Sequence, residues 1–122
     1  MELLVYKASA GSGKTFTLAV EYIKLLILNP RAYRQILAVT FTNKATAEMK
    51  ERILSQLYGI WKGDKDSDAY LKRIIAETGK PVEEVREAAK VALTNMLHDY
   101  SRFRVETIDS FFQSVMRNLP RP

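Results

Sequence analysis

The segment that most constrains the fold of this chain is a glycine-rich turn between two apolar stretches. It has the sequence Ala8-Ser9-Ala10-Gly11-Ser12-Gly13-Lys14-Thr15, and it follows a short apolar strand pattern over residues 3–6. A helix pattern runs from Phe16 to Leu28, without glycine or proline before Pro30. Glycines in such a turn let successive backbone N–H groups point into one concavity, and the start of the helix adds partial positive charge there.

This strand, turn and helix arrangement predicts a phosphate-binding loop of the Walker A type. In such a loop Lys14 reaches the β- and γ-phosphates of ATP, and the Thr15 hydroxyl ligates Mg²⁺. The strict pattern opens with glycine, where this chain has Ala8. A plain strand-to-helix turn with a solvated lysine is the alternative interpretation.

The composition is that of one globular domain with a basic surface. The chain has 122 residues, of which 47% are hydrophobic and 27% charged, and its net charge is +5. A positive balance suits a polyanionic partner such as nucleic acid. There is no cysteine, which excludes disulfides and thiolate metal sites. With no signal-peptide pattern at its start, and an apolar run over 18–28 too short to cross a bilayer, we expect a cytoplasmic protein.

Two further segments have strand character. Residues 36–41 are continuously apolar, which is typical of a parallel strand buried on both faces. Residues 102–108 alternate between polar and apolar side chains. Together with residues 3–6 they predict an α/β fold with a small, mostly parallel sheet of about three strands flanked by helices.

The rest of the chain has helical periodicity. Beyond 16–28, helices are expected over about 44–58, 69–78, 82–99 and 109–118. Thr42 or Asn43 is expected to cap the first of these. Residues 31–35 are expected to form a polar connection and residues 63–68 a solvated linker.

Two short segments stand at the predicted carboxyl ends of strands, where open α/β sheets bind ligands. They are Thr40-Phe41-Thr42-Asn43-Lys44-Ala45 and Thr107-Ile108-Asp109-Ser110-Phe111-Phe112. Small hydroxyls, an amide and aromatic rings at such positions suit contacts to phosphate oxygens and stacking on bases. Each segment alone fits equally well with helix caps followed by core phenylalanines.

Taken in order, three blocks of sequence resemble the N-terminal motor subdomain of UvrD/RecB-like superfamily 1 DNA helicases. They are residues 8–17, 38–53 and 103–113, and the nearest likeness is to the AddA/RecB branch of helicase–nucleases. The resemblance covers almost the whole chain except the helices between about residues 54 and 102. It implies a partial RecA-like P-loop NTPase layer spanning residues 1–122, with a helical insertion at about 60–101. The activity it implies is ATP-dependent DNA unwinding in repair or recombination.

The resemblance also implies roles for particular residues. The first block is motif I, so residues 8–15 would hold ATP, with Thr15 on Mg²⁺. Single-stranded DNA would be contacted through motif Ia by Thr40, Phe41, Thr42 and Asn43, and through motif Ib by Thr107, Ser110 and Phe111. Asp109 departs from the histidine common in many relatives, so it is given no DNA contact. The adenine-reading glutamine segment found before the loop in UvrD-type relatives is absent.

The sequence lacks part of the machinery that hydrolysis needs. No apolar run ends in Asp-Glu, so a Walker B carboxylate pair is missing, and the arginines of a second motor subdomain are missing too. We therefore expect a piece of a larger helicase that binds ATP without turning it over, and dimerisation through exposed sheet edges is a further expectation. Two rival functions are a small P-loop kinase, for which Arg102 and Arg104 are the only clustered lid arginines, and a DNA-binding module that takes no nucleotide.

Overall fold

The computed structural model describes residues 2–5 and 13–120, and describes side chains from residue 15 onward. In chain order each short strand is followed by one or more helices. They are β1 (Glu2–Val5), α1 (Gly13–Leu28), a 3₁₀ helix (Ala32–Gln35), β2 (Ile36–Thr40), α2 (Asn43–Lys62), a 3₁₀ helix (Lys65–Ser67), α3 (Asp68–Thr78), α4 (Val82–His98), a 3₁₀ helix (Tyr100–Arg102), β3 (Val105–Thr107) and α5 (Ile108–Arg117).

The strands form one small parallel sheet in the order β1-β2-β3. Val5 of β1 lies opposite Val39 of β2, and Thr40 of β2 lies opposite Thr107 of β3. All residues of β2 are buried, as its continuous apolar sequence predicted. The expectation of a small parallel sheet flanked by helices is confirmed, in a chain that is otherwise rich in helix.

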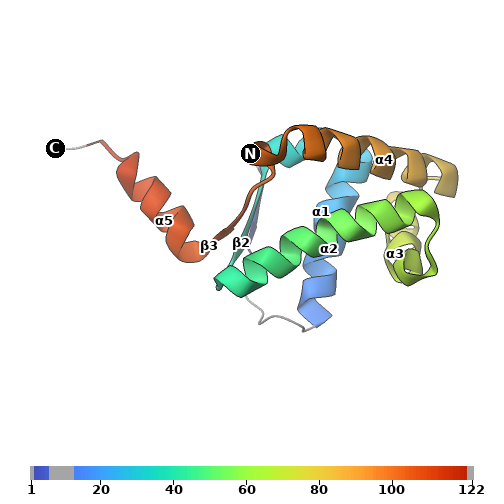
Figure 1. The fold of residues 1–122 in the computed structure, drawn as a ribbon, viewed down its shortest axis with the longest axis horizontal. Coiled ribbons are helices and arrows are strands. Elements are labelled where there is room, and N and C mark those ends of the chain that lie inside the picture. The colour runs from blue at the N-terminus through green and yellow to red at the C-terminus, as the bar shows by residue number, and fades with distance from the viewer. Residues whose placement is uncertain (1, 6–12, 121–122) are drawn as a thin grey trace.

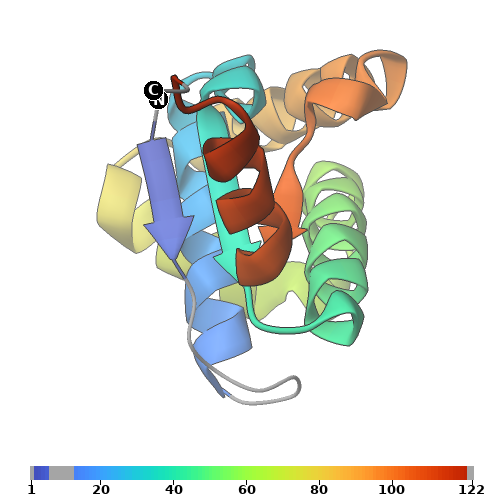
Figure 2. The same ribbon diagram turned by 90° about the vertical axis from the view of Figure 1, so that its left-hand side faces the viewer.

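The two faces of the sheet are covered very differently (Figures 1 and 2). Helices α1 to α4 lie together on one side, and α5 alone lies on the other. Side chains alternate between the faces along a strand, so Ile36 and Ala38 join the core beneath the helices while Leu37 and Val39 point towards α5. Within the described residues, the main core therefore lies between the sheet and four helices.

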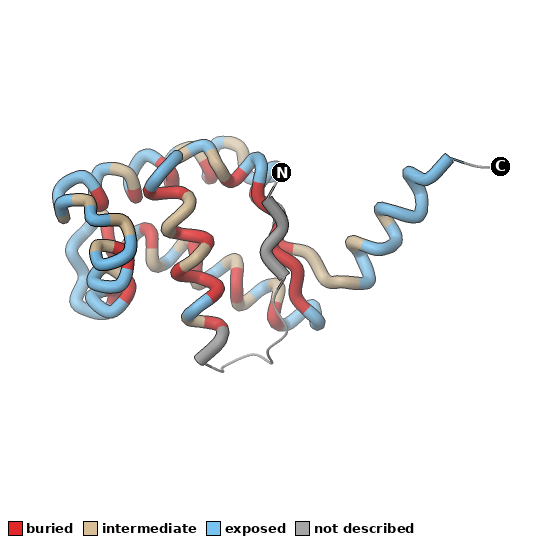
Figure 3. The backbone as a smooth tube through the Cα atoms, turned by 180° about the vertical axis from the view of Figure 1, so that it is seen from behind, coloured by how far each residue is buried: buried red, intermediate tan, exposed pale blue. Residues whose placement is uncertain are grey.

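Helix α1 runs through the middle of this core. Its buried residues are Leu18, Ala19, Val20, Tyr22, Ile23, Leu26 and Ile27. Figure 3 shows buried residues along α1 and on the inner sides of α2 and α4, whereas α5 is largely exposed. A helix that is apolar on most of its faces must be covered from several sides, which α2, α3, α4 and the sheet do here.

Several predicted boundaries are wrong, and α2 gives the clearest reason. The sequence suggested an end near Tyr58 because Gly59 and Gly63 follow, but α2 continues to Lys62. Gly63 does end it, with φ of 74° at the cap. Gly59 instead makes room for a neighbour, because a Cβ there would lie 1.9 Å from the Ser67 Oγ atom.

Two segments that were expected to be solvated hold buried side chains. Ser67, in the predicted linker over 63–68, is buried against Gly59, and the Asp64 side chain accepts a hydrogen bond from the Asp66 N–H at 3.0 Å. In the predicted polar connection over 31–35, Tyr33 is buried and its hydroxyl donates to Asp99 at 3.0 Å. The predicted strand over 102–108 is also shorter, because its ends belong to a 3₁₀ helix and to α5.

Ion pairs fasten the helices between β2 and β3 to the rest of the domain. Lys24 of α1 pairs with Glu77 of α3 at 3.1 Å, and Glu77 also pairs with Arg73. The hydrogen bonds from Arg73 and Lys24 lower the pKa of Glu77 below its usual range. Burial alone would raise the pKa of Asp99, but hydrogen bonds from Tyr33 and Arg34 outweigh it and hold that pKa low.

Tyr22 presents a buried hydroxyl without a hydrogen-bond partner among the described residues. Burial, and to a lesser extent the neighbouring Tyr33, raises the pKa of Tyr22 above the ordinary 10.0. The folded state therefore keeps this proton more strongly than the unfolded state, and its stability falls as the pH rises above about 10. The ring itself packs edge-on against Phe103, with 5.7 Å between centroids.

We expect Tyr22→Phe to stabilise the domain by about 1 kcal/mol at neutral pH, because it removes an unsatisfied hydroxyl and keeps the ring packing. The variant is also expected to lose less stability than wild type between about pH 9 and 11. Urea unfolding at several pH values measures both effects. A loss of stability at neutral pH would mean that the hydroxyl is satisfied in solution, for example by a buried water.

Candidate functional site

The carboxyl edge of the sheet is where the chemically active sequence segments meet. Because Thr40 and Thr107 are register partners in parallel strands, the segments that follow β2 and β3 leave the sheet side by side. Figure 2 shows that α1, α2 and α5 all begin at the end towards which the strand arrows point. Three helix N-termini, each with partial positive charge, are thereby placed at the same end of the sheet.

The segment after β2 is displayed on the surface at the start of α2. Thr42, one of the two caps that the sequence allowed, caps the helix, and its hydroxyl accepts a hydrogen bond from the Ala45 N–H at 3.0 Å. Phe41, Thr42 and Asn43 are exposed, and the Phe41 ring is 50% exposed although it is large and apolar. Phe41 lies between the end of β2 and the capped start of α2, which fix the backbone on both sides of it. Its ring is therefore held on the surface.

Thr40 differs from these neighbours because it is buried, with 1% of its surface exposed. Its Oγ1 atom lies 2.6 Å from Oγ1 of Thr46, and it lies within donating distance of the carbonyl oxygens of Thr42 (3.2 Å) and Glu106 (3.5 Å). This position gives Thr40 a structural part: it ties the end of β2 to β3 and to the first turn of α2. The part that Thr46 plays in this contact was not predicted from the sequence. Its only signal was a hydroxyl side chain in the first turn of the helix that follows the strand.

The segment after β3 resembles the segment after β2, because a threonine again caps the helix that follows the strand. Thr107 caps α5 by accepting from the Ser110 N–H at 3.1 Å. Ser110 and Asp109 are exposed in the first turn, and Phe111 is half-buried, its ring 6.0 Å from that of Phe112. The alternative interpretation, in which these phenylalanines belong to the core, does not hold for Phe112, which is exposed.

The predicted phosphate loop is described only in part. Residues 8–12 lie outside the described residues, while Gly13 and Lys14 form the first residues of α1 and Thr15 is buried within its first turn. Lys14 therefore stands where the pattern requires it, at the start of the helix that follows the loop. No group of three or more His, Asp or Glu side chains that could hold a metal occurs among the described residues.

In the part of the chain that the structure covers, no helix is both long enough and apolar enough to cross a membrane.

These features define a parallel α/β domain whose sheet edge gathers three helix N-termini and exposed hydroxyl, amide and aromatic groups. The sequence matches the family model of the UvrD/REP helicase N-terminal domain over residues 2–121. The chain therefore belongs to the UvrD/REP helicase family, as the resemblance of the three blocks indicated.

Individual relatives are consistent with this assignment. The RecBCD enzyme subunit RecB of Buchnera aphidicola subsp. Acyrthosiphon pisum is 33% identical over 122 residues, an alignment that covers 91% of this chain and 10% of that relative. The ATP-dependent DNA helicase UvrD1 of Mycobacterium leprae is 52% identical over 50 residues, covering 41% of this chain and 6% of the relative. DNA helicase II of Haemophilus influenzae is 44% identical over 71 residues, covering 52% of this chain and 10% of the relative.

The chain thus spans a tenth or less of the length of these relatives. No solved structure matches it significantly.

Proposed function

We propose that this chain is the ATP-binding and single-stranded-DNA-contacting part of an ATP-dependent DNA helicase or helicase–nuclease. The observation that carries the proposal is the convergence of α1, α2 and α5 at the carboxyl edge of the sheet, with the Thr40–Thr107 register bringing two DNA-binding segments together. Its family and those relatives that are named as DNA helicases support the same function.

For ATP, residues 8–15 are the proposed site. The backbone of the loop would cradle the phosphates, Lys14 would neutralise their charge, and Thr15 would ligate Mg²⁺. Helix α1 begins at Gly13, within this segment, so its N-terminus would add partial positive charge to the site. In this proposal the sheet and its helices are one part of a RecA-like layer.

For DNA, the exposed side chains at the strand ends are the proposed contacts. Phe41 would stack on a base, and the polar side chains of Thr42, Asn43, Thr107 and Ser110 would bind backbone phosphates. Phe111, which is half-buried, would contact the strand with the exposed part of its ring. Thr40 is proposed to act by holding these segments in place, because its hydroxyl is already used inside the domain.

In the larger protein, ATP hydrolysis would need groups that this sequence does not contain. A carboxylate pair to hold Mg²⁺ and orient water is absent, and Asp109 lies exposed in the first turn of α5, as a poor substitute. We therefore propose that this chain binds ATP without turning it over, that residues 60–101 form a helical insertion, and that the motor works in the cytoplasm in DNA repair or recombination.

The direct test uses the wild-type chain. Calorimetric titration with Mg·ATP, phosphate release on the same samples, and fluorescence anisotropy of a labelled oligo(dT) at several salt concentrations measure the three activities. We expect ATP binding, no turnover, and DNA binding that weakens as salt rises. Turnover would reopen the kinase alternative and the role of Asp109, whereas DNA binding without nucleotide binding would favour the DNA-binding module.

The same proposal includes dimerisation of the isolated chain. Helix α5 leaves an apolar face largely uncovered, with Phe112, Val115 and Met116 exposed. An uncovered amphipathic helix of this kind is a site of association. We expect a concentration-dependent dimer by light scattering, and Met116→Glu is expected to return it to a monomer. A wild type that stays monomeric at high concentration would contradict this part.

A further inference from the structure

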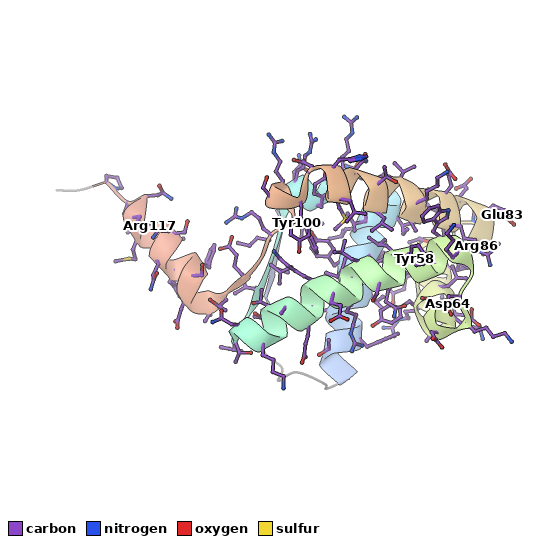
Figure 4. The ribbon with its side chains drawn as sticks, in the orientation of Figure 1. Tyr58, Asp64, Glu83, Arg86, Tyr100 and Arg117 are labelled. Carbon is purple, nitrogen blue, oxygen red and sulfur yellow. The ribbon has the colours of Figure 1, made fainter. Side chains whose placement is uncertain are left out.

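A pair of hydroxyl groups lies where the segments that follow β2 and β3 leave the sheet. The Oγ1 atoms of Thr40, at the end of β2, and Thr46, in the first turn of α2, are 2.6 Å apart. Thr40 is also the register partner of Thr107, which caps α5. Figure 4 shows Arg117 near the far end of α5, so the first turn of that helix is the part that lies near the start of α2.

The surroundings of the pair decide which hydroxyl donates. The buried Thr40 hydroxyl has one proton, and besides Thr46 it can reach two carbonyl oxygens, those of Thr42 at 3.2 Å and Glu106 at 3.5 Å. Within the described part of the chain, the Thr46 hydroxyl has Thr40 as its one partner. Both protons therefore find a protein acceptor only when Thr46 donates to Thr40 and Thr40 donates to a carbonyl oxygen.

This chain of two hydroxyl groups ends on the backbone of both segments. The Thr42 carbonyl oxygen also accepts from the Thr46 N–H at 3.0 Å, and the Thr42 hydroxyl caps α2. Thr42 directly follows the exposed Phe41, and Glu106 directly precedes Thr107. The backbone next to Phe41 and the backbone next to Thr107 are thus both within reach of one hydroxyl, which Thr46 orients.

We propose that Thr46 is a positioning residue for single-stranded DNA: through Thr40, its hydroxyl fixes the spacing between Phe41 and the start of α5. The inference rests on the DNA-binding function proposed above and adds to it a residue that touches no DNA, because the Thr46 hydroxyl is directed to Thr40. A strand that must engage two segments at once binds more tightly when their spacing is set beforehand, since less ordering is left to occur on binding.

The test compares Thr46→Val, which keeps the branched shape and removes the hydroxyl, with Thr46→Ser, which keeps the hydroxyl. We expect Thr46→Val to bind labelled oligo(dT) about fivefold more weakly than wild type by anisotropy, and Thr46→Ser to bind within about twofold of wild type. Thr94→Val is the matched control, because it removes a hydroxyl of α4 that donates to the Lys90 carbonyl oxygen at 2.9 Å. It should bind like wild type.

A double-mutant cycle separates positioning from an independent contact. If Thr46 acts by placing Phe41, then Thr46→Val should weaken binding by about twofold or less when it is added to Phe41→Ala. Losses that simply multiply would overturn the proposal. Wild-type binding by Thr46→Val, or equally weak binding by Thr46→Ser, would overturn it too.

Amide hydrogen exchange measures the same link without DNA. The Ala45 N–H donates to the Thr42 hydroxyl, so its protection from exchange reports on the cap beside Phe41. We expect about fivefold less protection in Thr46→Val and wild-type protection in Thr46→Ser. Unchanged protection in Thr46→Val would overturn the positioning role alone, whereas a wild type that does not bind oligo(dT) would overturn both this role and the proposed function.

Discussion

Lys14→Ala is expected to weaken Mg·ATP binding by about 100-fold or more, which corresponds to about 2.7 kcal/mol. The reason is that the lysine supplies the one full positive charge that the proposed loop places on the β- and γ-phosphates, and backbone N–H groups cannot replace it. Calorimetry on the purified variant measures the loss.

Two controls make this result specific. Lys72→Ala removes an exposed lysine of α3 and should leave ATP binding unchanged. Binding of oligo(dT) by Lys14→Ala, without nucleotide, should also stay near the wild-type value, because the proposed DNA contacts come from other segments. Unchanged ATP binding by Lys14→Ala would contradict the interpretation of residues 8–15 as a phosphate-binding loop.

Phe41→Ala is expected to weaken binding of single-stranded DNA by about 10- to 100-fold, because stacking of one base on an aromatic ring contributes about 1–3 kcal/mol. The ring is half-exposed, so its loss leaves little cavity and the variant should unfold at nearly the wild-type urea concentration. Anisotropy with labelled oligo(dT), together with urea unfolding, measures both quantities.

The matched control is Phe112→Ala, which removes an equally large exposed ring from α5. Since Phe112 is not among the proposed DNA contacts, this variant should bind oligo(dT) like wild type. The salt dependence of Phe41→Ala should match that of wild type too, since stacking releases no counterions. An equal loss of oligo(dT) binding in both variants would show that exposed aromatic rings contribute nonspecifically. Unchanged oligo(dT) binding by Phe41→Ala would show that Phe41 is not a DNA contact.

Much of the architecture could be read from local pattern. The continuous apolar residues of β2 predicted a strand buried on both faces, and the all-round apolar helix predicted that α1 lies inside. The helix cap could be narrowed to Thr42 or Asn43, because capping depends on a side chain and the next few N–H groups, and Thr42 fills that position. The family could also be recognised from three blocks of sequence.

Features that depend on distant neighbours could not be predicted in the same way. Gly59 looked like a helix end, but its partner Ser67 belongs to a loop that folds back onto α2. Tyr33 looked like part of a polar connection, but its hydroxyl reaches Asp99 beyond the end of α4. In each case the deciding contact joins residues that the local sequence does not relate.

The sequence by itself determined the kinds of chemical group in the candidate site and the elements that present them, because periodicity, caps and turn residues act within a few positions. Only the tertiary structure decided which of those groups reach the surface. It buried Thr40 and joined its hydroxyl to Thr46, exposed Phe41, and placed the ends of β2 and β3 side by side. Strand pairing and helix packing bring together residues that lie far apart in the chain, and burial is a property of that assembly.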